Sequence, residues 1–209
     1  GEELAKRGIV ASVAHSSGNY DTAYESLNHG FSDITHVYNA CTSCYKEGVF
    51  RRAGTVEAAL SDDRFSVQAI SDLVHLPVGV LRLIYKAKGS DKMYLITDGL
   101  EFSAFDMNEG EEFTQKNGVK VVYEDEVMKL ADRSCLAGST ANGARLVRNM
   151  YKTVGAPLTE AVKMMTLTPA RVIGVDSYKG KIAEGYDADI ILFDENVEVS
   201  SVMINGKLA

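Results

Sequence analysis

The chain contains 209 residues, of which 45% are hydrophobic and 24% are charged, and this is the composition of an ordinary globular domain with a sizeable core. Its net charge of −7 and the lack of a strongly basic stretch argue against nucleic acid or an anionic membrane as a partner. No apolar run approaches the roughly 20 residues that cross a bilayer.

The first half of the chain repeats one pattern, in which a short β-branched apolar run ends near a polar residue and a helical stretch follows. Before the first run, Glu2 to Gly8 is typical of the end of a helix, with Gly8 as its terminator, so we expect the sequence to be part of a longer protein. The predicted strands are Ile9 to Ala14, Ile34 to Tyr38, Phe65 to Ile70 and Met93 to Thr97. The predicted helices are Asn19 to His29, with Asn19 or Asp21 as the cap and Gly30 as the stop, and Pro77 to Lys88, which ends near Gly89.

These apolar runs lack the alternation of a half-exposed strand, which favours buried parallel strands. Parallel strands joined by helices place their carboxyl ends on one side, and in a (β/α)8 barrel that side is the active face. The polar residues at or after the ends of the runs are His15, His36, Asp72 with His75, and Asp98. We therefore expect four units of such a barrel, with these side chains on one face.

The region after Asp98 has a different pattern. Apolar runs on both sides of a polar turn at Glu124 to Glu126 predict a hairpin, inserted at about residues 112–136. Helices are predicted over Ala141 to Val154, with Ser139 or Thr140 as the cap, and over Thr159 to Leu167.

The last apolar runs predict two strands, Asp189 to Phe193 and Val199 to Ile204, followed by a turn at Asn205-Gly206. The sequence thus predicts an α/β fold that contains half of a (β/α)8 TIM-type barrel over residues 1–176. Residues 177–209 are expected to form strands of a small β-sandwich domain.

The three cysteines are Cys41, Cys44 and Cys135. This odd and sparse count argues against a disulfide scaffold and favours a reducing, cytoplasmic environment. Cys41 and Cys44 have the C-x-x-C spacing of redox pairs and of half a zinc site. Because no second such pair occurs and no redox-type turn surrounds this one, we assign it no function.

His15 and His36 follow consecutive predicted strands. A single histidine in such a place is usually a satisfied core or strand-end residue, but two at corresponding positions are good ligands for zinc or for iron(II). Asp98 precedes Gly99, which is a common turn pair. A carboxylate at a barrel mouth also binds a metal, or accepts a proton from a nucleophilic water and passes it to a leaving amine.

Three further groups are candidates for contact with a substrate, and two of them suit an anion. Arg51, beside Arg52 in the long loop, can grip a phosphate, although solvated surface charge is the default for such a pair. Asn39 and Ala40 follow the second histidine and offer neutral donors. His75 either contacts a substrate oxygen or caps the helix that begins near Pro77.

Five segments resemble one family, the N-acetylglucosamine-6-phosphate deacetylases of the amidohydrolase superfamily. They are Val13-Ala14-His15-Ser16, Thr35-His36-Val37-Tyr38-Asn39-Ala40, Asp72-Leu73-Val74-His75, Leu95-Ile96-Thr97-Asp98 and Leu136-Ala137-Gly138-Ser139-Thr140. The tail, with Thr168-Pro169-Ala170 and Asp187-Ala188-Asp189, is similar to the general superfamily signature. The resemblance extends over nearly all 209 residues and implies that residues 1–176 are the C-terminal part of a (β/α)8 barrel of the metal-dependent hydrolase kind.

The resemblance implies roles for these residues. His15 and His36 would bind a divalent metal, zinc or alternatively iron, and Asp98 would be the general base and acid. His75 would polarise the N-acetyl carbonyl, and the sugar phosphate would be held by Asn39, Ala40 and Arg51. The segment Leu136, Ala137, Gly138 and Ser139 would close on the substrate.

The resemblance also implies the reaction, hydrolysis of the N-acetyl amide of N-acetylglucosamine 6-phosphate, and a homodimer for the full-length protein. Two departures are visible: Arg51 is followed by Arg52-Ala53-Gly54 instead of Glu-Pro-Gly, and Leu73 replaces the glycine after Asp72. The family takes a further glutamate ligand from an earlier strand, which would precede Gly1. We therefore expect residues 1–209 alone to be inactive.

Two alternatives remain open. One is another amidohydrolase that acts on a cyclic amide or on a different N-acyl sugar. The other is a non-catalytic paralogue that binds a sugar phosphate. Joint retention of His15, His36, His75 and Asp98 favours an enzyme, since a binding protein has no physical need for all four.

Overall fold

The computed structural model describes all residues, 1–209, and shows an α/β fold built on a four-stranded parallel sheet. The sheet order is β1-β2-β5-β6, and every neighbouring pair is parallel. Its strands are β1 (Ala11–Val13), β2 (Phe31–Ile34), β5 (Ser66–Ala69) and β6 (Met93–Leu95). The predicted parallel arrangement is confirmed.

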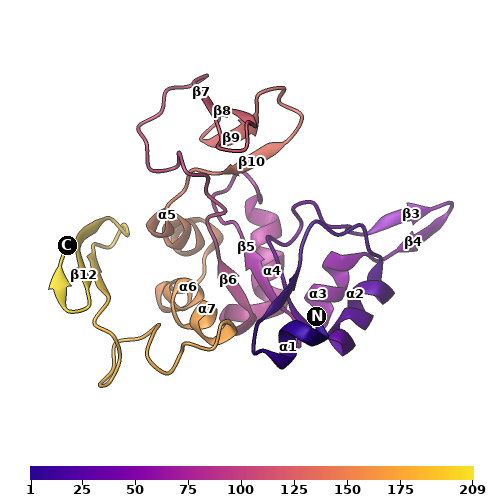
Figure 1. The fold of residues 1–209 in the computed structure, drawn as a ribbon, viewed down its shortest axis with the longest axis horizontal. Coiled ribbons are helices and arrows are strands. Elements are labelled where there is room, and N and C mark those ends of the chain that lie inside the picture. Colours follow the sequence, from indigo (N-terminus) through magenta and orange to yellow (C-terminus); the bar gives the residue numbers. More distant parts are fainter.

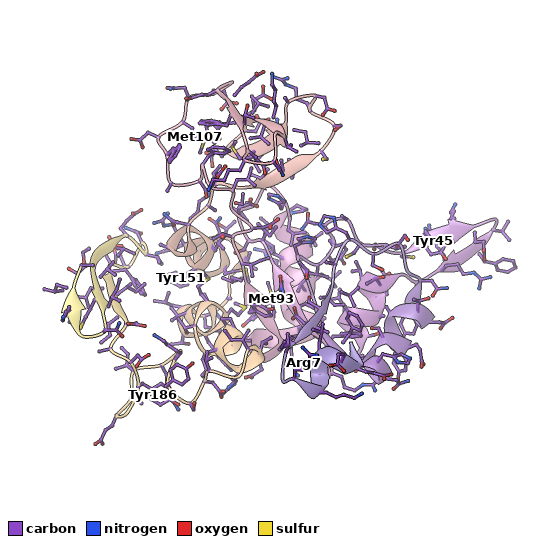
Figure 2. The ribbon with its side chains drawn as sticks, viewed as in Figure 1. Arg7, Tyr45, Met93, Met107, Tyr151 and Tyr186 are labelled. Carbon is purple, nitrogen blue, oxygen red and sulfur yellow. The ribbon has the colours of Figure 1, made fainter.

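The two faces of this sheet differ in polarity because alternate side chains of a strand point to opposite faces. Residues such as Ile34, Val67 and Met93 are fully buried and belong to a core cluster of 21 residues. Figure 2 shows Met93 at the centre of the molecule. The intervening residues form a polar face, made of Ser12, Asp33, Gln68 and Tyr94, one from each strand.

Helices connect the parallel strands and complete the core. They are α1 (Glu2–Lys6), α2 (Tyr20–Ser26) with the 3₁₀ turn η1 (Leu27–His29), α3 (Thr55–Ser61) and α4 (Val78–Lys92). The predicted cap Asn19 accepts a hydrogen bond from the Thr22 amide at 2.9 Å. Gly30 and Gly89 both have positive φ and end or interrupt their helices, as predicted.

An antiparallel sheet follows the parallel one and lies beyond its carboxyl-terminal end (Figure 1). Its strands, in sheet order, are β10 (Leu136–Ser139), β9 (Val127–Leu130), β8 (Lys120–Glu124) and β7 (Glu112–Thr114). The predicted central hairpin is present as β8 and β9. The sheet has its own small core of Phe102, Val121 and Met128, which explains why it projects as a separate lobe.

Three helical segments then pack between the parallel sheet and the end of the chain. They are α5 (Gly143–Arg148) with the π-helical segment η2 (Asn149–Val154), α6 (Leu158–Met165) and α7 (Leu167–Val172). A last antiparallel sheet contains β11 (Ile190–Phe193), β12 (Val199–Ile204) and β13 (Lys207–Leu208). Figure 1 shows this sheet on the far side of α5 and α6 from the parallel sheet.

Three predictions about elements were wrong. The second strand ends at Ile34 and does not run to Tyr38, because the chain turns there with positive φ at His36 and Tyr38. The long loop contains a hairpin of β3 (Tyr45–Glu47) and β4 (Phe50–Arg52), which projects from the molecule (Figures 1 and 2). The cap of α5 is Asn142, whose side chain accepts from the Arg145 amide at 2.9 Å, and not Ser139 or Thr140.

No helix of the structure has the length and apolar character that a membrane span requires.

Candidate functional site

The two predicted metal ligands lie together at the ends of β1 and β2. The Nε2 atoms of His15 and His36 are 2.9 Å apart, and the ring centroids are 4.8 Å apart. His36 is 6% exposed, whereas His15 is exposed to solvent. The parallel pairing of β1 with β2, through Val13 and Ile34, is what brings these strand ends side by side.

The backbone at these strand ends is unusual. His15, His36 and Asp98 have φ of 46°, 30° and 50°, a region that non-glycine residues rarely occupy. Each such residue costs on the order of 1–3 kcal/mol, and residues of this kind cluster at functional sites. Three of them, each after a different strand of one sheet, mark the carboxyl edge of the parallel sheet as the candidate site.

The histidine pair fits a divalent metal such as zinc. Two nitrogens that both bind one zinc ion at about 2.0–2.1 Å are separated by roughly 2.9–3.4 Å, and the separation of the two Nε2 atoms lies at the lower end of that range. Both Nε2 atoms must be unprotonated to bind, so each Nδ1 then carries the proton. His36 Nδ1 is buried and has no hydrogen-bond partner, although a ligand histidine usually donates from that atom.

The structure groups no third ligand with the two histidines. No set of three or more His, Cys, Asp or Glu side chains is placed to hold a metal ion. Asp98, after β6, is exposed and makes no hydrogen bond with either histidine. The assignment of His15 and His36 as metal ligands stays a prediction.

His75 is the other predicted catalytic histidine, and its partner is Asp72. Its Nδ1 lies 2.7 Å from Asp72 Oδ2, and the side chains of His75 and Asp72 are 5% and 0% exposed. Asp72 Oδ1 accepts the backbone N–H groups of Val74 and His75 at 3.0 and 2.9 Å. His75 therefore does not cap α4; it is fixed by a carboxylate three residues before it.

Leu73 stands where the family has glycine and has φ of 72°. This is the left-handed region that glycine enters without a steric cost. The tight turn between Asp72 and His75 is thus kept in this chain despite the substitution.

The segment Leu136 to Ser139 lies beside both acidic residues. The Ser139 amide donates to the Asp98 carbonyl at 3.1 Å, and the Ser139 side chain contacts Asp72. A Cβ at Gly138 would lie 2.8 Å from the Asp98 carbonyl oxygen, so only glycine permits this approach. Ser139 therefore joins Asp98 to the Asp72–His75 pair.

The predicted phosphate-binding residues are not all near this group. The Asn39 amide and side chain both donate to the His36 carbonyl, at 2.9 and 3.3 Å, and Ala40 follows with φ of 51°. Arg51 lies on β4 of the projecting hairpin, is exposed, and makes no hydrogen bond or ion pair with another predicted site residue. The structure thus brings Asn39 and Ala40, but not Arg51, to the histidine pair.

Sequence reasoning missed a buried carboxylate on the polar face of the parallel sheet. Asp33 is 1% exposed, and its Oδ2 accepts from Ser12 Oγ, Gln68 Nε2 and Tyr94 OH at 2.8, 2.7 and 3.1 Å. Its Oδ1 is buried without a partner, and burial raises the pKa of this carboxyl despite those hydrogen bonds. Asp33 was missed because the predicted strand begins at Ile34 and leaves this residue outside, whereas β2 spans Phe31–Ile34.

Comparison with known proteins places the chain in a family. The model of the amidohydrolase family matches residues 74–209. The chain is 33% identical over 205 residues to an N-acetylglucosamine-6-phosphate deacetylase of Haemophilus influenzae, with 98% of this chain and 52% of that protein covered. It is 32% identical over 209 residues to an N-acetylgalactosamine-6-phosphate deacetylase of a Shewanella species, with 99% and 50% covered.

Solved structures agree in fold. The N-acetylglucosamine-6-phosphate deacetylase of Pasteurella multocida superposes with a TM-score of 0.90 at 30% identity, over 100% of this chain and 52% of that one. A mutant of the Mycobacterium smegmatis enzyme in complex with N-acetyl-D-glucosamine-6-phosphate gives 0.89 at 26% identity, over 99% and 53%. The chain spans about half the length of the relatives it matches. On the family match and the arrangement of the strand-end residues, the chain belongs to the amidohydrolase family.

Proposed function

We propose that this chain is the C-terminal part of a metal-dependent deacetylase that hydrolyses the N-acetyl amide of N-acetylglucosamine 6-phosphate to glucosamine 6-phosphate and acetate. The observation that carries the proposal is the 2.9 Å distance between the Nε2 atoms of His15 and His36, which follow two neighbouring parallel strands. The names of the relatives support the substrate, since the Haemophilus influenzae protein and the Pasteurella multocida structure are both called deacetylases of this sugar phosphate.

The proposed roles follow from chemistry and position. His15 and His36 would hold the metal, most simply zinc, and a divalent metal held there would lower the pKa of water toward about 7 and so make a nucleophile available at neutral pH. Asp98 accepts the proton of the nucleophile and delivers it to the leaving nitrogen. Its exposed position at the carboxyl edge of β6 leaves this carboxylate open to a substrate.

Substrate binding is proposed for the residues around these groups. His75 contacts the N-acetyl group, and Leu136, Ala137, Gly138 and Ser139 line the substrate from the side of Asp98. Asn39 and Ala40, beside His36, contribute donors to the phosphate. For Arg51 the phosphate role rests on residue type alone, because Arg51 lies on the hairpin of β3 and β4 that projects from the molecule (Figure 1) and makes no hydrogen bond with another predicted site residue.

We further propose that residues 1–176 are part of a (β/α)8 barrel and that residues 177–209 are part of a small β domain. The parallel β-α order of the first half supports the barrel. A cleft of about 910 Å³, lined mostly by apolar side chains, separates α5 and α6 from the last sheet and supports a separate β domain. A cytoplasmic, homodimeric full-length protein is proposed on the free cysteines and on the resemblance.

The test is acetate release from N-acetylglucosamine 6-phosphate in the presence of zinc, measured for the complete reading frame that contains this chain. We expect release that is lost in Asp98→Asn and retained in the matched control Asp106→Asn, an exposed loop aspartate. Residues 1–209 alone are expected to release none, because they group no third metal ligand. Absence of release from folded, metal-loaded full-length protein refutes the proposed substrate.

A second candidate substrate is N-acetylgalactosamine 6-phosphate, the C4 epimer. The Shewanella relative with that name is 32% identical to this chain, which is close to the 33% of the Haemophilus influenzae relative. Running the same assay on both sugar phosphates decides between them. If kcat/KM is higher for N-acetylgalactosamine 6-phosphate than for N-acetylglucosamine 6-phosphate, the galactosamine derivative is the substrate.

A further inference from the structure

The buried pair of Asp72 and His75 has a defined proton arrangement. Burial raises the pKa of the Asp72 carboxyl, but the hydrogen bonds that this carboxyl accepts from His75 hold its pKa below the usual value, so Asp72 is ionised at neutral pH. An ionised carboxylate only accepts hydrogen bonds. The 2.7 Å contact between Asp72 Oδ2 and His75 Nδ1 therefore requires the proton on Nδ1.

The other ring nitrogen of His75 is free and reachable. His75 Nε2 makes no hydrogen bond within the protein. The side-chain polar atoms that are both buried and without a partner are Asp33 Oδ1 and His36 Nδ1, and His75 Nε2 is not one of them. The nearly buried ring thus presents one atom, Nε2, to whatever approaches the site.

We propose that Asp72 is a positioning residue that fixes His75 as the Nδ1–H tautomer, so that the atom offered to the substrate is an unprotonated Nε2. The part of this inference that concerns the substrate rests on the proposed function. Neutral His75 then accepts a hydrogen bond from a substrate hydroxyl or amide N–H. It donates to a carbonyl oxygen only as the imidazolium, whose charge the ionised Asp72 balances.

The other contacts of Asp72 fix which of its two oxygen atoms faces His75. Asp72 Oδ1 is already occupied by the backbone N–H groups of Val74 and His75. In Asp72→Asn those two donors hold the amide oxygen in the position of Oδ1. The NH₂ group must then take the place of Oδ2, where it donates to His75 Nδ1 and moves the ring proton to Nε2. The variant keeps the shape of the side chain and reverses the tautomer.

The test is a long-range proton–nitrogen NMR correlation spectrum of residues 1–209 with ¹⁵N-labelled histidine, recorded above the pH at which the rings are protonated. We expect a protonated Nδ1 and an unprotonated Nε2 for His75 in the wild type, and the reverse in Asp72→Asn. His29, an exposed histidine next to Glu2 and Glu25, is the internal control and should be unchanged.

A wild-type His75 with its proton on Nε2 overturns the inference without any variant, so the test does not depend on whether Asp72→Asn folds. An unchanged His75 tautomer in a folded Asp72→Asn chain overturns it as well. A purely structural role for Asp72 would leave the tautomer unspecified. Since neither spectrum involves catalysis, a failed acetate assay and a failed tautomer assignment are separate results.

Discussion

At the scale of single residues, His15 and His36 form the close pair on which the proposed metal site depends. Two imidazoles give an incomplete set, since catalytic zinc sites usually have three protein ligands. We expect residues 1–209 to bind zinc weakly, and His15→Ala or His36→Ala to abolish the binding. Isothermal titration with zinc measures it.

The matched control for the metal titration is His29→Ala, because His29 is exposed and lies against glutamates, away from the strand ends. It should bind zinc as the wild type does. Equal loss of binding in all three variants would show that the metal binds nonspecifically and would remove the basis for the proposed site.

Asp33 gives a second prediction at the residue scale. Because burial raises the pKa of this carboxyl in the folded state, the unfolded chain ionises first as the pH rises, and the folded state holds more protons. The wild type should lose stability from about pH 4 upward, until the raised pKa is passed, at no more than about 1.4 kcal/mol per pH unit.

Asp33→Asn removes the ionisable group and should therefore gain stability relative to the wild type as the pH increases from about 4 to 7. Urea unfolding at several pH values measures the difference. Asp106→Asn, an exposed substitution, should show none. A difference between Asp33→Asn and wild type that is constant with pH would contradict the assigned cause.

At the scale of elements, the buried Lys88 joins two helices. It lies on α4 and is 5% exposed, and its Nζ donates to the carbonyl oxygens of Ala59 and Asp62 at 3.0 and 2.7 Å. These carbonyls are at the C-terminal end of α3, where a helix leaves acceptors unpaired and favours a positive charge. The Lys88 ammonium group on α4 therefore caps the C-terminal end of α3.

Lys88→Met keeps the apolar stem and removes the donor, so two carbonyls lose their partner. We expect a loss of about 2–3 kcal/mol in the free energy of unfolding, the cost of removing hydrogen bonds from a charged group. Lys86→Met on the same helix is exposed and should change stability by less than about 0.5 kcal/mol. Chemical denaturation of the two variants compares them, and similar values would contradict a capping role.

At the scale of the whole molecule, an apolar cleft lies between α6 and the last sheet. Ile191 lines it and is 49% exposed. Because large exposed apolar patches bind apolar partners, the chain should enhance the fluorescence of anilinonaphthalene sulfonate. Ile191→Lys should reduce that signal, whereas Ile173→Lys, 64% exposed and outside the cleft, should not. Equal dye binding by both variants would place the dye elsewhere.

The order of elements was largely accessible from the sequence because it depends on local patterns. Apolar runs gave the four parallel strands, and Asn19, Gly30 and Gly89 acted as the helix signals predicted for them. The hairpin of β3 and β4 was missed because its strands are exposed and polar, so they lack an apolar pattern. The cap Asn142 was missed because Ser139, which was one of the two predicted caps, is the last residue of β10.

The sequence by itself determined the residue types of the candidate site, since His15, His36, His75 and Asp98 follow predicted strands and are residue types that a metal-dependent hydrolase uses. Only the tertiary structure decided which of them meet. Strand pairing brought His15 next to His36, and a turn brought His75 next to Asp72. Ser139 lies beside that second pair and donates to the Asp98 carbonyl, whereas Arg51 lies on the projecting hairpin. The physical reason is that residue type and period are local, whereas contact between strand ends depends on sheet register and on turns that bring distant segments together.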